Sequence, residues 1–423
     1  MPANGLKPTE SNPWRWVPSL YLIEGLPNAL VVTVAVVMLK NLGLNNGLVA
    51  LYTSLLYLPW VIKPLWSPFV DIIGSKRRWI GAMQLTLGAA MAAIALSLSM
   101  PWWLAGALTG FWAAALASAT HDIAADGFYL LALDRREQAF FVGIRSTFYR
   151  LATLLASGGV VWLAGRAMAR GIEPTPAWQM IFGGLGALFL LAAIWHRIAL
   201  PHPEADRAAL ARSAGEVMRE FALTFKTFFQ RRNIGVALLF MLLYRLPEAF
   251  LCKMVQPFLL DPAAEGGLGL TVEQVGLANG TFGVIGIVLG GIVGGIVMSR
   301  AGLRRCLWPM ALALTVPSGF YCYLALTQTT NMAVICSGIA LEQFGYGFGF
   351  TAYMMYLMVF SKGSEFATSH YAFSTGIMAL GLMLPGIIAG HLELAVGYSA
   401  FFGIVMILCV PTLAVTYLVR RTV

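Results

Sequence analysis

Two carboxylates stand inside an apolar segment that is long enough to cross a membrane. They are Asp122 and Asp126, in the stretch LASATHDIAADGFYLLAL at 116–133. Their i, i+4 spacing places both on one face of a helix. A carboxylate at membrane depth is costly without a partner, so such residues are candidate functional groups. The next apolar segment carries Arg145 and Arg150, whose guanidinium groups can neutralise the carboxylates.

Two interpretations of these charges are open. In the first, Asp126 forms a structural ion pair with Arg145 or Arg150 and holds two helices together, as buried charge pairs often do. In the second, one carboxylate carries a proton during a reaction cycle, or an arginine binds an anionic substrate. Since Asp122 lies deeper in the segment than Asp126, we expect Asp126 to form the pair and Asp122 to take up the proton.

Other polar residues inside apolar segments are candidates by the same argument. Further proton-coupling candidates are Glu24, Glu248 and Glu342. Further substrate-binding candidates are Lys63, Arg145, Arg245, Tyr21, Asn28, Tyr346 and Tyr353. A packing role is the alternative for each: Arg245 and Glu248 are spaced i, i+3 and can pair. Gly345 and Gly349 predict close approach of a neighbouring helix.

The composition indicates an integral membrane protein. Of the 423 residues, 59% are hydrophobic and 11% are charged, whereas soluble domains are about half apolar and a quarter charged. Runs of about 20 apolar residues can each span a bilayer. Twelve such runs are predicted, at 17–38, 47–70, 79–99, 102–131, 140–164, 177–197, 234–259, 273–299, 306–327, 331–360, 367–390 and 397–419. The longest connection, 200–233, has charges at helical spacing and predicts an amphipathic helix at the membrane surface.

The basic residues predict the orientation. If both termini lie in the cytoplasm, most of the Lys and Arg residues outside the predicted helices lie on the cytoplasmic side. Only three face the exterior: Lys40, Arg166 and Arg170. This asymmetry follows the positive-inside rule. The net charge of +9 is therefore explained by topology, and we expect no nucleic-acid partner. The start of the chain lacks the pattern of a cleaved signal peptide, so the first helix is expected to remain.

An internal repeat divides the chain. SPFVDIIGSKRR at 67–78 and GIVMSRAGLRR at 295–305 align at an offset of 228 residues, which pairs Gly74 with Gly302. The duplication predicts two pseudo-symmetric six-helix bundles, 1–199 and 234–423, joined by the cytoplasmic linker 200–233. Asp71, Gly74 and Arg77 in the first loop are candidate gating residues. The charges inside predicted helices avoid the third, sixth, ninth and twelfth, which we expect to face lipid.

Five strings resemble a known family. SPFVDIIGSKRR is similar to the loop signature of the major facilitator superfamily, with Ser67 and Ile72 at positions where glycine and arginine are usual. GLPNAL, IKPLWSPFVD, ATHDIAADGF, LEQFGYGFGFTAYMMYLM and ATSHYAFSTGIMALGLMLPGIIAG resemble the AmpG-like permeases within it. Asp122 and Asp126 match the two family aspartates and Lys63 the family lysine, whereas His121 replaces the usual glutamine.

The resemblance implies a function. An AmpG-like permease imports anhydro-muropeptides (GlcNAc-anhydroMurNAc and its peptides) across the bacterial inner membrane, driven by the proton gradient, for cell-wall recycling. The alternatives are a facilitator for another anionic solute, such as a ferric siderophore or an acyl-CoA-like compound, and, from other classes, a passive channel or a sensor. No catalytic or metal-binding motif is evident, so we expect no enzyme activity, no metal and no cofactor. A monomer that binds a small-molecule substrate in the lipid bilayer is expected.

Overall fold

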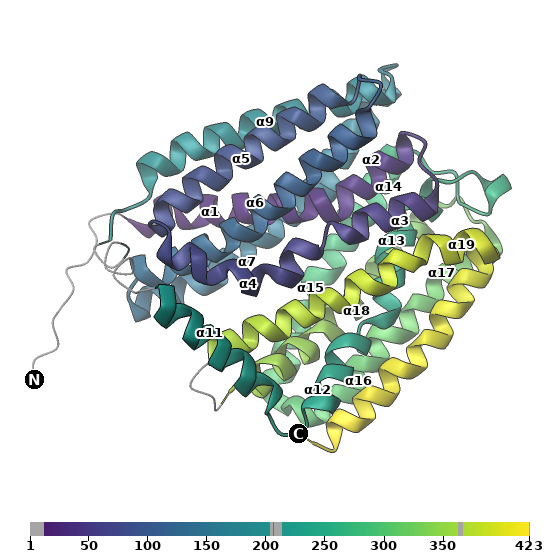
Figure 1. Cartoon of the computed structure of the whole chain (residues 1–423). Helices are drawn as coiled ribbons and strands as arrows, with labels where there is room; N and C mark the ends of the chain where they lie inside the picture. The colour runs from purple at the N-terminus through teal and green to yellow at the C-terminus, as the bar shows by residue number, and fades with distance from the viewer. Residues whose placement is uncertain (1–11, 204–205, 207–213, 363–366, 423) are drawn as a thin grey trace, which may run out of the picture. The chain divides into compact units, whose positions relative to one another are not determined.

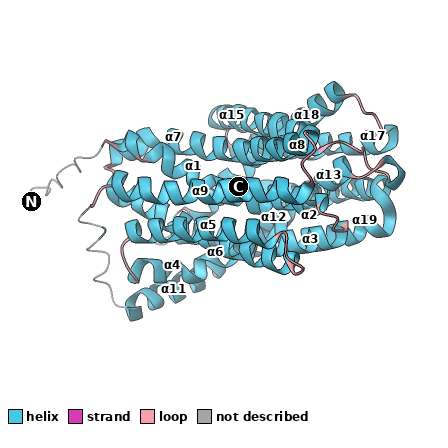
Figure 2. Ribbon diagram, turned by 90° about the horizontal axis from the view of Figure 1, so that it is seen from above, coloured by secondary structure: helices cyan, strands magenta, loops and turns pink. Residues whose placement is uncertain are grey.

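The computed structural model describes residues 12–203, 206, 214–362 and 367–422. Over these residues the chain is helical and contains no strand (Figure 2). Helices satisfy their backbone N–H and C=O groups internally, which a chain of this apolar composition requires in a membrane. The predicted all-helical class is therefore confirmed.

The chain forms two compact units. Unit 1 comprises Met1–Asn28, Leu65–Thr153 and Phe182–Phe221, and unit 2 comprises Ala29–Pro64, Leu154–Ile181 and Ala222–Val423. Unit 2 thus contains two pieces of the first sequence half together with all of the second half, 234–423. The predicted division into bundles 1–199 and 234–423 concerns the duplication in the sequence, and it stays a prediction.

The helices of the first half are interrupted in two places. They are α1 (Val17–Ala29), α2 (Ala35–Asn41), α3 (Asn46–Leu55), α4 (Leu58–Ile72), α5 (Lys76–Ser97), α6 (Trp103–Ala132), α7 (Arg135–Leu154), α8 (Val161–Ala169) and α9 (Pro174–Ala199). Two π-helical segments, Leu30–Val34 and Leu155–Val160, join α1 to α2 and α7 to α8. In unit 1, α5 lies beside α6 (Figure 1).

The second half follows the linker helix α11 (Ala214–Phe229). Its helices are α12 (Ile234–Leu243), α13 (Leu246–Leu260), α14 (Val272–Val275), α15 (Val284–Ala301), α16 (Leu303–Thr315), α17 (Gly319–Thr327), α18 (Met332–Ser361) and α19 (Ala367–Arg420). A third π-helical segment, Gly276–Gly283, joins α14 to α15. The linker helix covers part of the predicted amphipathic stretch 200–233.

Ten helical segments of the described chain are long and apolar enough to cross a membrane. The predicted number of spans, twelve, differs from these ten at two places in the chain. The 30-residue helix α18 is not among the ten, and α19 includes two predicted spans in one element. Gly397 interrupts α19 with a φ of +75°, so the chain bends between the two predicted spans.

Side-chain caps fix where several helices begin. Asn45 accepts a hydrogen bond from the Leu48 amide at 2.9 Å, and Asn331 accepts one from the Ala333 amide at 3.0 Å. Thr271 and Gln274 form a reciprocal capping box at α14. Such caps satisfy amides that have no partner within the helix.

The two glycines aligned by the repeat have the same unusual backbone. Gly74 precedes α5 with a φ of +104°, and Gly302 precedes α16 with a φ of +75°. Side chains other than glycine are strained in this region. The shared backbone explains why the repeat keeps glycine at both positions. The side chain of Asp71 lies outside the described residues.

Glycines set the packing of α18 against two neighbours. A Cβ atom at Gly290 of α15 would overlap the carbonyl oxygen of Phe344, and one at Gly345 of α18 would overlap that of Ala313 in α16. The close approach predicted from Gly345 and Gly349 is thus confirmed, and α15 lies along α18 as well (Figure 1). Small residues allow such backbone contacts between membrane helices.

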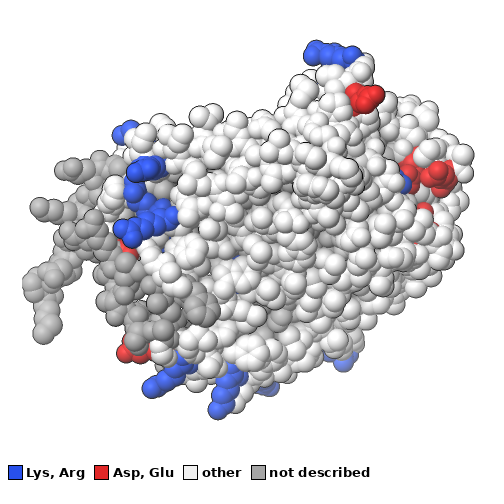
Figure 3. Space-filling model, turned by 45° about the horizontal axis from the view of Figure 1, so that its top comes forward, with Lys and Arg blue, Asp and Glu red and all other residues white. Residues whose placement is uncertain are grey.

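Large apolar side chains cover the exposed faces of the helices expected to contact lipid. Examples are Leu96 of α5, Ile198 of α9, Leu326 of α17 and Ile407 of α19, each about 70% exposed. Most of the surface drawn in Figure 3 is uncharged, and its charged side chains occur in small groups. Such extensive apolar exposure fits contact with lipid rather than with water.

We predict that Gly290→Ala destabilises the protein by about 1–3 kcal/mol, because the added methyl group overlaps the Phe344 carbonyl and forces α15 away from α18. Gly295→Ala is the matched control, since Gly295 lies in the same helix and a Cβ there meets no atom within 4 Å. Thermal unfolding of the purified protein in detergent measures the difference. Equal unfolding temperatures for the two variants would show that the glycine contact is unimportant.

Candidate functional site

Asp126 of α6 is the centre of a charged cluster in unit 1. Its Oδ1 atom lies 2.9 Å from Nη2 of Arg145 in α7 and accepts a hydrogen bond of 3.2 Å from the Tyr21 hydroxyl in α1. The Arg145 guanidinium also lies over the Tyr21 ring at 4.6 Å and the Tyr129 ring at 5.1 Å. The cluster therefore joins three helices through one carboxylate and one cation.

This ion pair is accessible to solvent. The side chains of Arg145 and Asp126 are 29% and 46% exposed. Water screens a pair of this kind, so it stabilises the fold by about 1 kcal/mol at most. Because water also hydrates the charges, the cost of placing Asp126 in an apolar segment is much lower than in lipid. A charged pair that contributes little stability and remains accessible can exchange partners with a proton or an anionic ligand.

The structure selects Arg145 rather than Arg150 as the partner of Asp126. Arg150 is exposed, and no ion pair of its guanidinium occurs within the described part of the chain. Glu24 is 6% exposed, whereas Asn28 and Asp122 are half-buried. The six residues Tyr21, Glu24, Asn28, Asp122, Asp126 and Arg145 all lie in unit 1.

The neighbour of Asp122, His121, points into the helix packing instead. Nε2 of Gln84 in α5 donates to Nε2 of His121 at 3.0 Å, and Oε1 of Gln84 accepts from Nδ1 of His196 in α9 at 3.1 Å. All three side chains are at most 1% exposed. This buried chain connects α5, α6 and α9, so His121 has a packing role. No pattern in the sequence indicates that Gln84 and His196 share this role.

A second group of candidates surrounds Arg245 in unit 2. Arg245 precedes α13, donates to the Tyr346 hydroxyl, and lies 4.7 Å from the centre of the Phe350 ring. Its Nε atom is buried without a hydrogen-bond partner among the described residues. No ion pair joins Arg245 to Glu248 in the described chain, although their spacing permits one. The guanidinium therefore keeps a donor that a ligand can use.

Two buried glutamates interact in this unit, and one of them, Glu248, also interacts with Arg245. Glu342 of α18 is 2% exposed and accepts hydrogen bonds from Tyr321 at 3.2 Å and from Gln343 at 2.8 Å. Glu248 is 9% exposed. Two buried carboxylates that interact are costly when both are ionised, because like charges repel and water is excluded. This arrangement suits a site that holds a proton.

Other candidates in unit 2 have different surroundings. Lys63 of α4 is half-buried. Tyr353 is fully buried, donates to the Met241 carbonyl at 2.6 Å and stacks on Tyr244, which fits a packing role. Lys253 of α13 is also fully buried, and its ammonium donates to the Thr53 carbonyl at 3.1 Å. Lys253 therefore links α13 to α3.

The gating candidate Arg77 contacts the end of α9. Its side chain donates to the carbonyl oxygens of Leu200 and Arg197. The carboxylate of Asp206 in the linker accepts hydrogen bonds from the backbone amides of Lys76 at 2.7 Å and Arg77 at 3.2 Å. The first turn of α5 is thus tied both to α9 and to the linker, all within unit 1. Asp206 was not among the predicted residues.

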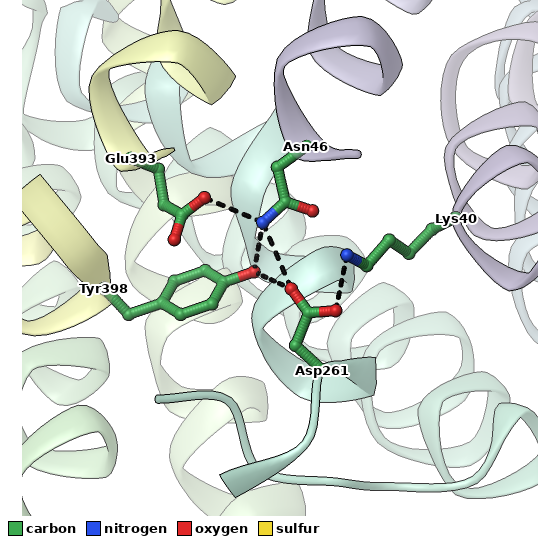
Figure 4. A network of polar contacts seen from close by, with 5 residues as sticks. All are labelled: Lys40, Asn46, Asp261, Glu393 and Tyr398. Carbon is green, nitrogen blue, oxygen red and sulfur yellow. Dashed lines mark hydrogen bonds and ion pairs between the residues drawn. The ribbon is translucent and has the colours of Figure 1, made fainter. Parts of the chain in front are cut away.

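A polar cluster in unit 2 was not predicted from the sequence (Figure 4). Its five members are Lys40, Asn46, Asp261, Glu393 and Tyr398. The predicted helix ended at 390, which assigned Glu393 to a loop, but α19 continues to Gly397. The helix extends because no glycine or proline interrupts it between Gly390 and Gly397. The signal available was two carboxylates and an asparagine at predicted helix ends.

No metal centre was found in the described chain: no group of three or more His, Cys, Asp or Glu side chains there has suitable geometry. Its titratable residues instead form the separate ion-pair and hydrogen-bond clusters described above.

Comparisons with known proteins identify the family of the chain. The family profile of the Major Facilitator Superfamily matches residues 19–390. The chain is 27% identical to the anhydromuropeptide permease of Escherichia coli K12 over 94% of this chain and 78% of that protein. It is 25% identical to an AmpG-like transporter of Rickettsia conorii, with 93% of each chain covered.

The fold matches solved transporters as well. The crystal structure of a D-xylose–proton symporter superposes with a TM-score of 0.75 over 95% of each chain, at 12% sequence identity. At that identity the likeness concerns the fold alone. The family match covers most of the chain and both sequence halves, and the relatives are permeases. The protein therefore belongs to the Major Facilitator Superfamily and is a multi-pass membrane transporter of a small molecule, not an enzyme.

Proposed function

We propose that this protein is a proton-coupled symporter that imports anhydro-muropeptides across the bacterial inner membrane for cell-wall recycling. The similarity to the E. coli anhydromuropeptide permease over 94% of the chain supports the substrate. Both termini lie in the cytoplasm in this proposal, because the basic residues are concentrated on that side. The proton gradient supplies the energy, and the transporter needs no cofactor.

The observation that carries the proposal is the accessible Asp126–Arg145 pair beside Asp122. Muropeptides bear carboxylates, and arginine binds a carboxylate through two parallel hydrogen bonds. A substrate carboxylate that takes Arg145 displaces Asp126, which then becomes a free base. Proton uptake by an aspartate of this group and substrate binding are thereby linked.

Unit 2 offers a candidate site of its own. Arg245, with an unused Nε donor, can hold an anionic group, and the Tyr346 ring beside it can pack on a sugar. Glu248 and Glu342 are rival proton sites in this unit. Lys63 completes the set of cations proposed to bind the substrate. We propose that the transporter acts as a monomer.

We predict that Asp126→Arg combined with Arg145→Asp restores transport or expression that each single change removes, because the swap preserves the ion pair between α6 and α7. Arg150→Gln is the control and should retain at least half of wild-type activity, since that side chain is exposed. Uptake by cells and the yield of purified protein are the measurements. A double variant no better than the worse single variant would show that the pair itself is dispensable.

We predict that a protonophore abolishes concentrative uptake of labelled anhydro-muropeptide into membrane vesicles.

We predict that Asp122→Asn also abolishes concentrative uptake, while substrate binding persists. The amide resembles a permanently protonated carboxylate, so the proton cannot be released in each cycle. Glu173→Gln, which alters an exposed carboxylate before α9, should behave as wild type. Uphill uptake by Asp122→Asn with normal pH dependence would assign the proton to Asp126 or to a glutamate. Uphill uptake after the proton gradient has been collapsed would refute proton coupling. Accumulation of a ferric siderophore instead of the muropeptide would refute the assignment of the substrate.

We predict that amidation of the substrate carboxylates weakens binding to the wild type by about tenfold or more, since each lost charge-assisted hydrogen bond costs about 1.5–3 kcal/mol. The loss should be much smaller in whichever of Arg145→Gln, Lys63→Gln or Arg245→Gln removes the responsible cation. Binding to purified protein, measured by calorimetry, tests this. Equal affinities of the wild type for both substrate forms would contradict the role of the cations.

A further inference from the structure

The polar cluster at Asn46 joins the two halves of the sequence inside unit 2. Asn46 begins α3 and Lys40 ends α2, whereas Asp261 follows α13 and both Glu393 and Tyr398 belong to α19. In Figure 4, the Asn46 amide points between Glu393 and Tyr398, and Lys40 approaches Asp261 from the opposite side. Each contact of Lys40 or Asn46 in the cluster therefore crosses from the first half to the second.

The geometry of the cluster is specific. The Asn46 amide nitrogen lies 2.7 Å from Oε2 of Glu393, 2.8 Å from the Tyr398 hydroxyl and 3.1 Å from Oδ2 of Asp261. The Tyr398 hydroxyl donates to the same Asp261 oxygen at 2.6 Å. Lys40 forms an ion pair with the other oxygen of Asp261. Asn46, Asp261, Glu393 and Tyr398 are 2–4% exposed.

The cluster stands between solvent and the packed interior. Lys40 and Asp261 line a cavity of about 510 Å³ that also touches Gly165, Leu270 and Glu273. Behind them, Ser54 lies two turns along α3 from Asn46 and is fully buried. A path from the cavity to Ser54 along α3 therefore passes the cluster.

Close backbone contacts extend the same junction. A Cβ atom at Gly390 of α19 would overlap the Asn46 carbonyl, one at Gly165 of α8 would overlap the backbone of Glu273, and one at Gly280 would overlap the Ser157 carbonyl. These contacts also join the first half to the second within unit 2. Surfaces that fit this closely separate as a whole or not at all, so a small number of polar contacts can determine whether they do.

We propose that Lys40, Asn46, Asp261, Glu393 and Tyr398 form the latch of an access gate, which holds the sequence halves together at this end and must break before the interior opens there. The latch rests on the proposed function, because only transport by alternating access requires this end of the protein to open. With both termini in the cytoplasm, as proposed above, this end faces the exterior. A polar latch suits repeated opening, since its charges regain water when they separate. If a substitution removes one member of the ion pair, the other charge stays buried without its partner, and the closed state becomes less stable.

The test measures how fast a buried cysteine reacts. Ser54→Cys, a nearly isosteric change, is introduced after replacement of the five native cysteines, and intact cells are treated with a small, charged methanethiosulfonate from outside. Tyr398→Phe and Asp261→Asn should each increase the reaction rate about tenfold. Tyr398→Phe removes a buried hydrogen bond to the Asp261 carboxylate, and Asp261→Asn removes the charge of that carboxylate. Arg166→Gln is the matched control and should stay within about twofold: its 3.5 Å pair with Glu273 also crosses the halves but is exposed.

Several outcomes would overturn the latch. These are equal rates in all variants, an equal increase in Arg166→Gln, or an increase seen only when the reagent reaches the cytoplasmic side. If Asp261→Asn does not accumulate in the membrane, Tyr398→Phe decides alone, since its ring keeps the contacts with Phe258 and Phe402. The reaction needs neither substrate nor a proton gradient. A positive result with no muropeptide uptake would therefore refute the proposed function and leave the latch intact.

Discussion

A polar group that leaves water must find a partner, and this requirement governs how charges are placed in the chain. Glu342 is buried and receives two donors, the fully buried Lys253 donates to a carbonyl and a hydroxyl of Thr53, and Asp261 accepts from Tyr398 while it pairs with Lys40. The Asp126–Arg145 pair meets the requirement differently, because it remains partly hydrated. Buried groups thus stay paired for as long as water is excluded from them, whereas hydrated pairs can be exchanged at low cost.

Backbone contacts meet a second requirement, since lipid supplies no hydrophobic force to bring helices together. Glycines on the three helices α15, α18 and α19 bring the main chains of neighbouring helices into direct contact. The resulting surfaces lack flexible side chains that could adapt. In unit 2, the Asn46 cluster lies beside one of these surfaces, where Gly390 of α19 meets the Asn46 carbonyl. Rigid surfaces with a few exchangeable polar contacts are suited to alternate between discrete arrangements rather than to deform gradually.

The fold was largely predictable, because apolar run length and basic-residue asymmetry are direct consequences of the bilayer. The Asp126 pair was predictable from i, i+4 spacing and an adjacent arginine, but the choice of Arg145 over Arg150 depends on how α7 is rotated. Asn46, Asp261 and Glu393 were missed for a physical reason. They lie at or just beyond the ends of three predicted helices far apart in sequence, and polar residues at such positions are ordinarily assigned to solvent. Only the tertiary packing of α3 and α13 against α19 buries them.

The π-helical segment Gly276–Gly283 has a consequence for how this sequence can change. Each residue turns an α-helix by about 100°, and a π-helix accommodates residues that a regular helix of the same length cannot. Within the segment, Gly276 and Gly280 contact Trp162 and Ser157; beyond it, Gly286, Gly290 and Gly294 contact α18. Loss of one residue here would leave a more regular helix whose glycines no longer face both partners. Insertions and deletions in this helix are therefore constrained by rotational phase, independently of hydropathy and length.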